Sequence, residues 1–267
     1  MLSSEIIKIK NSLKTLQPGA VAFSGGVDST LLLYLCREVW EKPPLALTFL
    51  SPLLTPPERE RIQDLTRRIG ADLVWMKTKE YRDPDFKKNT KQRCYVCKKS
   101  RLAQAKGLLR KKEISFLLDG TNADDLKTYR PGIRAAREVG VISPLAREGW
   151  SKEDIRRVSR KLGLPTWNLP SSPCLASRVA YGYPITLPLL RRLYLGEEVL
   201  LKMGFSQYRL RYHGPLVRIE VPEKEQHILI QGRTRQELLS RLTALGFTYV
   251  TLDLKGFRSG SMDEVLK

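Results

Sequence analysis

The sequence lacks the features that mark secreted, membrane-spanning or disulfide-rich proteins. No apolar run approaches the roughly 20 residues that a membrane helix needs, and the start, MLSSEIIKIK, holds no apolar core of a cleavable signal. The four cysteines are unevenly placed and do not form the paired framework of a small secreted domain. We therefore expect a soluble, cytoplasmic protein without a membrane partner, in which cysteines serve a metal site or catalysis.

Low hydrophobicity, the mark of disorder, is also absent, since 42% of the residues are hydrophobic. A chain of 267 residues can form a nucleotide-binding domain and a small appendage. The formal charge of +19 predicts attraction to polyanions such as tRNA, nucleotides or phosphorylated substrates, without choosing among them. Many basic residues lie in ordinary helix patterns such as EDIRRVSRKLG, which we interpret as solvated faces.

Short apolar runs alternate with amphipathic stretches in the first two thirds of the chain. Helices are expected to begin at Thr55, which two prolines follow, and at Ser151, with Asp154 three residues later as a capping-box variant. Alternation of strand and helix predicts an α/β fold, a doubly wound parallel sheet with helices on both faces, over residues 1–180. The runs typical of buried strands are GAVAFS, PLALTF, ADLVWM, ISFLLDG and GVISPL.

An irregular segment rich in Pro and Ser, from Asn168 to Pro184, leads to a second domain over 181–267. This region predicts a small α+β domain that binds substrate, mediates homo-oligomer formation, or does both. Its expected elements are a helix in LPLLRRLYLGEEVLLKMGF, a hairpin from QYRLRY to LVRIEV, a helix in RTRQELLSRLTALGF and a last strand in TYVTLDL.

The strongest motif is VAFSGGVDST, where a buried strand ends in a glycine turn and a helix begins. Glycines let the backbone approach phosphate oxygens, and the N–H groups of the following helix start point at the anion. The ending of a Walker P-loop and the G-x-G-x-x-G of a dinucleotide fold are both absent. A structural turn with a helix cap is the weaker alternative. The predicted phosphate-binding residues are Ser24, Gly25, Gly26, Asp28, Ser29 and Thr30.

A second polar turn follows the apolar run of LLDGTNADD. Ligands of open α/β sheets bind outside the carboxyl ends of the strands, so both loops are expected to meet at one crevice. Taken alone, the segment is also compatible with an ordinary turn that carries Asx caps. The residues predicted to face the nucleotide are Gly120, Thr121, Asn122 and Asp125.

Cys94 and Cys97 lie three residues apart beside several cations, which favour thiolates. With Cys174 they would suit a [4Fe–4S] cluster with one open iron. Zinc is the main competitor, but a closed zinc site needs a fourth ligand, and the two histidines lie far along in the second domain. Cys36 falls in the apolar run LLLYLC and is interpreted as core.

Ser-Gly-Gly-x-Asp-Ser after the first strand resembles the PP-loop of the superfamily that cleaves ATP to AMP and pyrophosphate. Within it, the chain is similar to the LarE family of sulfur transferases, which build the nickel-pincer cofactor of lactate racemase. The segments that carry this resemblance are SGGVDST, RCYVCKK, DGTNADD, RPG at 130–132, PCLASR, the RLRYHG…LVRIEV hairpin and GFRSGSMDEVL.

The resemblance implies that ATP adenylates a carboxylate of pyridinium-3,5-biscarboxylic acid mononucleotide, with Asp28 placing Mg²⁺. A sulfur nucleophile then displaces AMP. Cys174 is implied as the key cysteine, which is sacrificed in single-cysteine members. The presence of Cys94 and Cys97 as well resembles members that hold a cluster and use sulfide or another sulfur donor.

Arg209 and Arg211 alternate on one face of a predicted strand, which suits a substrate phosphate or carboxylate as well as it suits an exposed basic strand. Glu198 and Glu220 could complete a phosphate or metal site, although exposed acids are an equal alternative. Arg178 of PCLASR is a further candidate for substrate binding. The first rival function is a tRNA thiolase, against which stand the absence of an added RNA-binding domain and of exposed aromatics among the cations.

Overall fold

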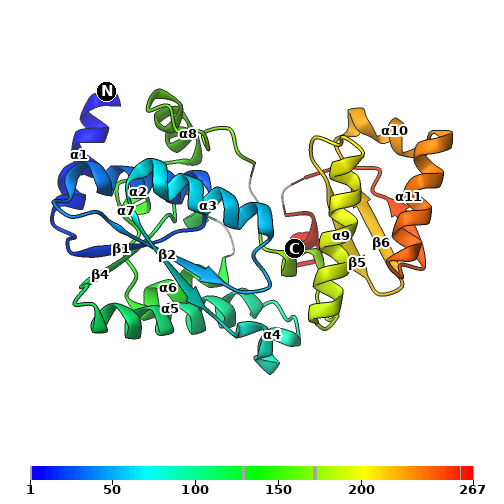
Figure 1. The fold of residues 1–267 in the computed structure, drawn as a ribbon, viewed down its shortest axis with the longest axis horizontal. Helices are drawn as coiled ribbons and strands as arrows, with labels where there is room; N and C mark the ends of the chain where they lie inside the picture. The colour runs from blue at the N-terminus through cyan, green and yellow to red at the C-terminus, as the bar shows by residue number, and fades with distance from the viewer. Residues whose placement is uncertain (1, 128–129, 171–172, 259, 267) are drawn as a thin grey trace. The chain divides into compact units, whose positions relative to one another are not determined.

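The structure is a computed structural model that describes residues 2–127, 130–170, 173–258 and 260–266 (Figure 1). Ser171 and Ser172 of the predicted irregular segment, and Ser259 of the GFRSGSMDEVL motif, lie outside the described residues. The chain divides into two compact units. The first comprises Met1–Glu80 and Gln92–Ser172, and the second comprises Tyr81–Lys91 and Pro173–Lys267.

This division differs from the expected boundary at 180/181 in two respects. Cys174 and Arg178 belong to the second unit. The short segment Tyr81–Lys91 belongs to it as well, so the chain leaves the first unit after Glu80 and returns to it at Gln92. None of the helices in the described ranges is long and apolar enough to cross a membrane.

The first unit contains a parallel sheet with the strand order β3-β2-β1-β4. The chain moves outward from β1 to β3 and then returns to the other side of β1 with β4, so the strand order reverses between β1 and β4. At such a point the connections from neighbouring strands leave in opposite directions, which opens a crevice at the carboxyl ends. The strands are β1 (Gly19–Ala22), β2 (Leu45–Leu50), β3 (Asp72–Lys77) and β4 (Phe116–Asp119).

Helices cover both faces of this sheet, as the predicted doubly wound fold requires (Figure 1). The helices of this unit are α1 (Leu2–Lys14), α2 (Val27–Val39), α3 (Pro56–Ile69), α5 (Arg93–Lys111), α6 (Pro131–Val139), α7 (Pro144–Arg147) and α8 (Lys152–Lys161). The expected starts of α3 and α8 are confirmed, because Thr55 and Ser151 each form a capping box with the third residue of the helix.

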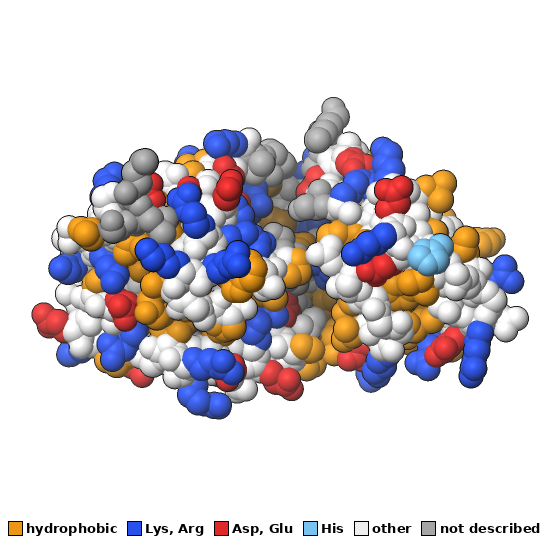
Figure 2. Space-filling model, turned by 90° about the horizontal axis from the view of Figure 1, so that it is seen from above, with side chains coloured by type: hydrophobic (Ala, Val, Ile, Leu, Met, Phe, Trp, Pro, Cys, Tyr) orange, Lys and Arg blue, Asp and Glu red, His pale blue; other side chains and the backbone are white. Residues whose placement is uncertain are grey.

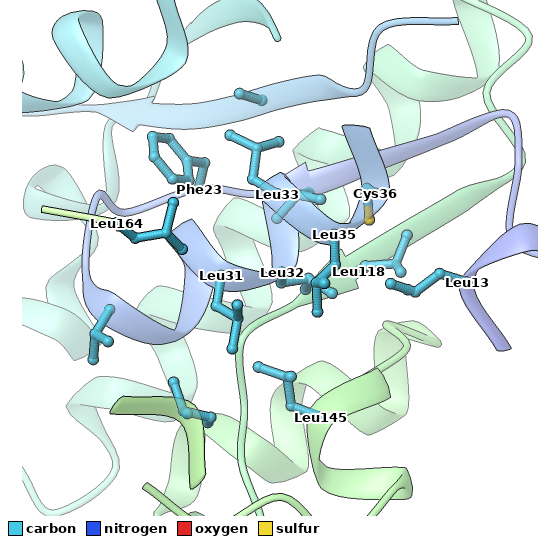
Figure 3. Packing of buried hydrophobic residues seen from close by; sticks show 14 of the residues in the cluster. Leu13, Phe23, Leu31, Leu32, Leu33, Leu35, Cys36, Leu118, Leu145 and Leu164 are labelled. Atoms are coloured by element: carbon cyan, nitrogen blue, oxygen red, sulfur yellow. The ribbon is translucent and has the colours of Figure 1, made fainter. Parts of the chain in front are cut away.

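Alternate residues of each strand enter two separate cores. Val21 and Leu118 pack with α2 on one face, where Figure 3 shows leucines of α2 beside Leu118 and Leu145. Ala20 and Leu117 pack on the other face with α5 and α6. Cys36 is completely buried in the first of these cores, and burial raises the pKa of its thiol, in agreement with a packing role.

The predicted fifth strand, GVISPL, is wrong as an extended strand. Only Ile142 forms an isolated parallel bridge, to Leu118, and Pro144 then begins the short helix α7. Proline has no N–H to donate to a neighbouring strand and suits the first turn of a helix, so it ends the pairing after one bridge.

The second unit is the expected small α+β domain. Its hairpin and last strand form the order β5-β6-β7, in which β5 and β6 are antiparallel and β6 and β7 are parallel. Its strands are β5 (Arg209–His213), β6 (Leu216–Glu220) and β7 (Tyr249–Leu252), and its helices are α4 (Pro84–Lys87), α9 (Leu187–Lys202), α10 (Gln226–Ile230) and α11 (Gly232–Ala244). Short 3-10 turns occupy Leu175–Arg178 and Ser261–Leu266.

Asn89 fixes the segment Tyr81–Lys91 within the second unit. It is completely buried, and its side-chain nitrogen donates to the carbonyls of Ala180 and Tyr183 over 2.8 and 2.9 Å. The backbone of Asn89 has a φ of 53°, in the left-handed region that asparagine tolerates better than most residues. One side chain therefore anchors a segment that lies far away in sequence.

We predict that Asn89→Ala destabilises the second unit by about 2–4 kcal/mol. The change removes a buried hydrogen-bond donor, and alanine is less stable than asparagine in the left-handed region. Asn89→Gly should cost about 1 kcal/mol less, since glycine adopts this φ freely. Urea unfolding followed by circular dichroism measures both variants.

Tryptophan fluorescence provides the internal control for these variants. All four tryptophans, at positions 40, 75, 150 and 167, lie in the first unit. The fluorescence transition should therefore stay in place while the transition of the second unit moves. A shift of the fluorescence transition alone would contradict the assignment of Asn89 to the second unit.

Candidate functional site

Hydroxyl groups hold the loop after β1 in shape. Ser24 Oγ and Ser29 Oγ lie 3.1 Å apart, and Ser29 Oγ donates to the Gly26 carbonyl over 3.2 Å. Gly26 is the N-cap of α2, where no side chain caps the first turn. The start of a helix with N–H groups that no side chain satisfies is a natural anion site. The geometry fits the predicted phosphate cradle.

Two residues of the motif contribute through the backbone or the core. Gly25 has a φ of 69°, which favours glycine, and Arg61 of α3 donates from Nε to its carbonyl over 3.2 Å. Thr30 is completely buried, and its hydroxyl has no hydrogen-bond partner among the described residues. Its side chain therefore lines the interior beneath the loop.

Gly120 brings the loop after β4 against the start of α2. A Cβ on this residue would lie 2.8 Å from the Ser29 amide nitrogen and 3.1 Å from the Asp28 carbonyl carbon. Such distances are shorter than real Cβ contacts, so only glycine permits this approach. The two loops that were expected to converge do lie together at the carboxyl ends of β1 and β4.

The carboxylate of Asp28 is the centre of polar contacts at this corner. Asn122 Nδ2 donates to Asp28 Oδ1 over 3.4 Å, and Lys152 Nζ lies 2.6 Å from Asp28 Oδ2. The side chains of Lys152 and Asp28 keep 31% and 22% of their exposure, so solvent and ligands reach this pair. A partly exposed carboxylate beside a phosphate cradle fits the coordination that Mg²⁺ takes with ATP.

The remaining polar residues of the second loop maintain its conformation. Asn122 and Asp125 exchange hydrogen bonds between side chain and backbone over 3.1 and 3.2 Å, and Arg130 lies 2.8 Å from Asp125 Oδ1. The Thr121 carbonyl accepts from the Ala146 amide over 3.1 Å. These contacts position Asn122 toward Asp28.

Asp119, the last residue of β4, ties the cysteine-bearing helix to this corner. Its buried carboxylate lies 2.8 Å from Lys98 Nζ and accepts from Ser143 Oγ over 2.6 Å. Burial acts to raise the pKa of Asp119, but Lys98, Ser143 and Thr121 outweigh it and hold the pKa below the ordinary range of an aspartate. Asp119 therefore stays ionised at neutral pH.

Cys94 and Cys97 lie near the start of α5, three residues apart and thus on the same face of the helix. Cys94 is exposed and Cys97 is partly exposed. Gly132 at the start of α6 fits against this turn, since a Cβ there would lie 3.7 Å from the Cys94 carbonyl oxygen. Tyr95 also links the two helices through a 2.5 Å hydrogen bond to Glu138.

Cys174 lies in the second unit, immediately before the turn Leu175–Arg178. The Arg178 guanidinium donates to the Cys174 carbonyl over 3.2 Å and forms a two-point ion pair with Glu197 over 2.9 and 3.0 Å. Arg178 and Glu197 are both buried. This fork-to-fork contact holds the backbone at Cys174 in place.

The two predicted arginines of β5 have different surroundings. Arg211 is buried and pairs with Glu220, which is completely buried and also accepts from Arg218 and Ser261. Arg209 lies over the Phe257 ring at 5.3 Å.

Arg209 is also the more perturbed of the two. Burial and the nearby Arg178 charge lower its pKa to about 10. A guanidinium held among other cations suits an anionic ligand, which would relieve this repulsion.

Glu198 lies on α9 within 2.7 Å of the Tyr194 hydroxyl and is only partly exposed. It does not join Glu220, which the structure places in the arginine network of the sheet. Sequence reasoning missed Glu197, although the helical spacing from Leu193 and Leu200 marks its position as buried. It also missed Lys152, for which no sequence signal shows a direction toward Asp28.

Basic side chains do not gather into one patch on the face shown in Figure 2, where they are scattered among acidic and apolar ones. Several pair with an acid one helical turn away, such as Arg68 with Asp64 and Arg241 with Glu237. For these residues the interpretation as solvated helix faces agrees with the structure.

Comparison with known proteins identifies the family. No family model matches the chain. An uncharacterised protein of Synechocystis sp. is 38% identical over 266 residues, which cover 100% of this chain and 99% of the relative. The pyridinium-3,5-bisthiocarboxylic acid mononucleotide synthase of Lactiplantibacillus plantarum is 34% identical over 258 residues, 96% of this chain and 92% of the relative. The chain belongs to the family of that synthase, the LarE family.

The LarE-family chain is thus an enzyme of the PP-loop sulfurtransferase kind. One component of the glutamine-hydrolysing GMP synthase of Thermoplasma volcanium is also similar, with 29% identity over 201 residues that cover 66% of this chain and 62% of the relative.

We predict that Glu220→Gln lowers the free energy of unfolding by about 3–5 kcal/mol, because it leaves the buried Arg211 without its counter-charge. Glu198→Gln is the matched control and should cost less than about 1 kcal/mol. Urea unfolding of the second unit measures both. If Glu220→Gln weakened substrate binding while leaving unfolding unchanged, Glu220 would be a ligand rather than a structural partner.

Proposed function

We propose that the chain is an ATP-dependent sulfur transferase acting on pyridinium-3,5-biscarboxylic acid mononucleotide in nickel-pincer cofactor biosynthesis. The observation that carries this proposal is the convergence of the glycine loop after β1, the loop after β4 and Asp28 at one corner of the sheet. The identity with the synthase of Lactiplantibacillus plantarum supports the substrate.

The first proposed step activates a carboxylate of the substrate. A carboxylate oxygen attacks the α-phosphorus of ATP, the bond from this phosphorus to the bridging oxygen breaks, and pyrophosphate leaves with the electron pair. The product is a mixed anhydride of the carboxylate and AMP. Activation is needed because a carboxylate oxygen is a poor leaving group, whereas AMP is a good one.

The residues of the first unit suit this step because they can bind the charged phosphates and the metal ion. The start of α2 and the glycines of its loop would bind the pyrophosphate portion, and Asp28 would bind Mg²⁺. The metal supplies neutralising charge for the phosphates when it is bound. Asn122 orients the Asp28 carboxylate from the neighbouring strand end. Positioning of this kind accounts for much of the catalysis of phosphoryl and adenylyl transfer.

The second unit would hold the substrate anion. Besides burial, the nearby charges of Arg178 and Arg211 lower the pKa of Arg209. This concentration of cations suits a phosphate or a second carboxylate. Arg209 is the arginine whose pKa burial and the neighbouring cations lower most, so an anionic ligand would relieve the repulsion there.

In the second proposed step a sulfur nucleophile attacks the carbonyl carbon and AMP leaves with the electron pair, which gives a thiocarboxylate. Cys94 and Cys97 on one helical face fit two ligands of a [4Fe–4S] cluster with an open iron, and Cys174 would be the third. The part of the chain that the structure describes contains no group of three His, Cys, Asp or Glu side chains that could hold a metal ion. Cys174 belongs to the second unit. Such a cluster would supply an iron position for the transferred sulfide.

We predict that Asp28→Asn lowers the rate of pyrophosphate release at least about a hundredfold, because the amide no longer binds the magnesium ion that neutralises the phosphates. Pyrophosphate is measured with ATP, Mg²⁺ and the biscarboxylate nucleotide, with and without sulfide. Asp64→Asn, on the exposed surface of α3, is the control and should retain activity.

The same assay separates the rival functions. Pyrophosphate release that requires tRNA and ignores the biscarboxylate nucleotide would replace the proposal with a tRNA thiolase. Release that proceeds unchanged in Asp28→Asn would contradict the role of the carboxylate.

We also predict that anaerobic reconstitution of the wild type with iron and sulfide gives about four irons and four sulfides per chain, with visible absorption. Cys94→Ala should lose this cluster, because only two of the three thiolates remain. Cys36→Ala is the control, since Cys36 lies in the core. If no cluster forms and Cys174 instead loses the mass of H₂S after reaction with ATP and substrate, the cysteine itself is the sulfur source.

A further inference from the structure

Lys152 is the cation nearest to the proposed metal-binding carboxylate. Its Nζ atom lies 2.6 Å from Asp28 Oδ2, on the side of the carboxylate opposite the oxygen that Asn122 contacts. None of the residues predicted from the sequence to bind phosphate is a cation, although ATP brings several negative charges to the loop. Lys152 supplies the charge that this set lacks.

The backbone at Lys152 is held by hydrogen bonds to the loop after β4. Lys152 is the first residue of α8, and its amide donates to Asp124 Oδ2 over 2.9 Å. The preceding Ser151 closes the capping box of the helix, and the Trp150 carbonyl accepts from the Ala123 amide over 2.8 Å. The base of the side chain is therefore held by the loop after β4, while its ammonium group remains at a partly exposed position.

The Lys152–Asp28 pair can exchange partners at low cost. A half-exposed ion pair is worth little, because both groups are well solvated when apart. A divalent ion between phosphate oxygens and Asp28 competes directly with the ammonium for the same carboxylate oxygen. Once displaced from Asp28, a lysine anchored at this corner would be available to phosphate oxygens bound by the loop after β1.

We propose that Lys152 is a phosphate-binding residue of the nucleotide site, paired with Asp28 before ATP binds and with a phosphate oxygen of ATP once Mg²⁺ occupies Asp28. This inference rests on the proposed ATP-dependent function and adds to it the cation that receives the phosphates. Arg61 donates to the Gly25 carbonyl, so its guanidinium is engaged by the backbone of the loop.

The test measures binding of α,β-methylene-ATP with Mg²⁺ by calorimetry. Lys152→Met should weaken binding about ten- to a hundredfold, the effect of losing a charge-assisted hydrogen bond. Lys152→Arg should restore most of the affinity because it keeps the charge. Lys127→Met is the matched control, since Lys127 pairs with Asp124 of the same loop but is exposed, and its affinity should be unchanged.

A second readout follows Mn²⁺ by electron paramagnetic resonance in the protein without nucleotide. Lys152→Met should bind Mn²⁺ more tightly than the wild type, since the competing ammonium is gone, whereas Lys152→Arg, which keeps the charge, should give no gain. Unchanged tryptophan fluorescence checks that the variant is folded. Equal affinity of Lys152→Met and wild type for α,β-methylene-ATP would overturn this inference alone. Failure of the wild type to bind the analogue would overturn the proposed function with it.

Discussion

The proposed nucleotide site at the carboxyl ends of β1 and β4 depends on one close approach between two loops. Because Gly120 has no Cβ, the loop after β4 reaches the first turn of α2, where any other residue would collide with the Ser29 amide and with Asp28. The approach is possible only where β1 and β4 are neighbours and the strand order reverses. Asn122 contacts Asp28 as a direct consequence of it.

Two ion pairs, one in each unit, differ in exposure and therefore in how readily their partners can change. In the first unit the Lys152–Asp28 pair is partly exposed, so its partners can change when a ligand arrives. In the second unit the Arg211–Glu220 pair is buried, and removal of one partner would leave an uncompensated charge. An exposed pair suits a site that binds and releases a ligand, whereas a buried pair suits a hairpin held in one register.

Much of this arrangement follows from local patterns. Buried strands, capping boxes and the β5–β6 hairpin were predictable because apolar periodicity and turn residues act within a few residues. The role of GVISPL was not, since Pro144 stops the pairing that its apolar residues favour. The placement of Tyr81–Lys91 depends on hydrogen bonds from Asn89 to carbonyls about ninety residues away, which no local pattern encodes. The contact of Lys152 with Asp28 has the same long-range origin.

The three cysteines outside the core lie where the chain passes from one unit to the other. Cys94 follows the passage at 91/92 by a few residues, and Cys174 follows the one at 172/173. Asn89, next to the first passage, hydrogen-bonds to the segment just beyond the second, and this contact lies entirely within the second unit. The backbone near Cys174 and the chain leading to Cys94 are thereby fixed to the same small domain. Proposed sulfur chemistry that uses both cysteine segments therefore depends on the second unit being folded.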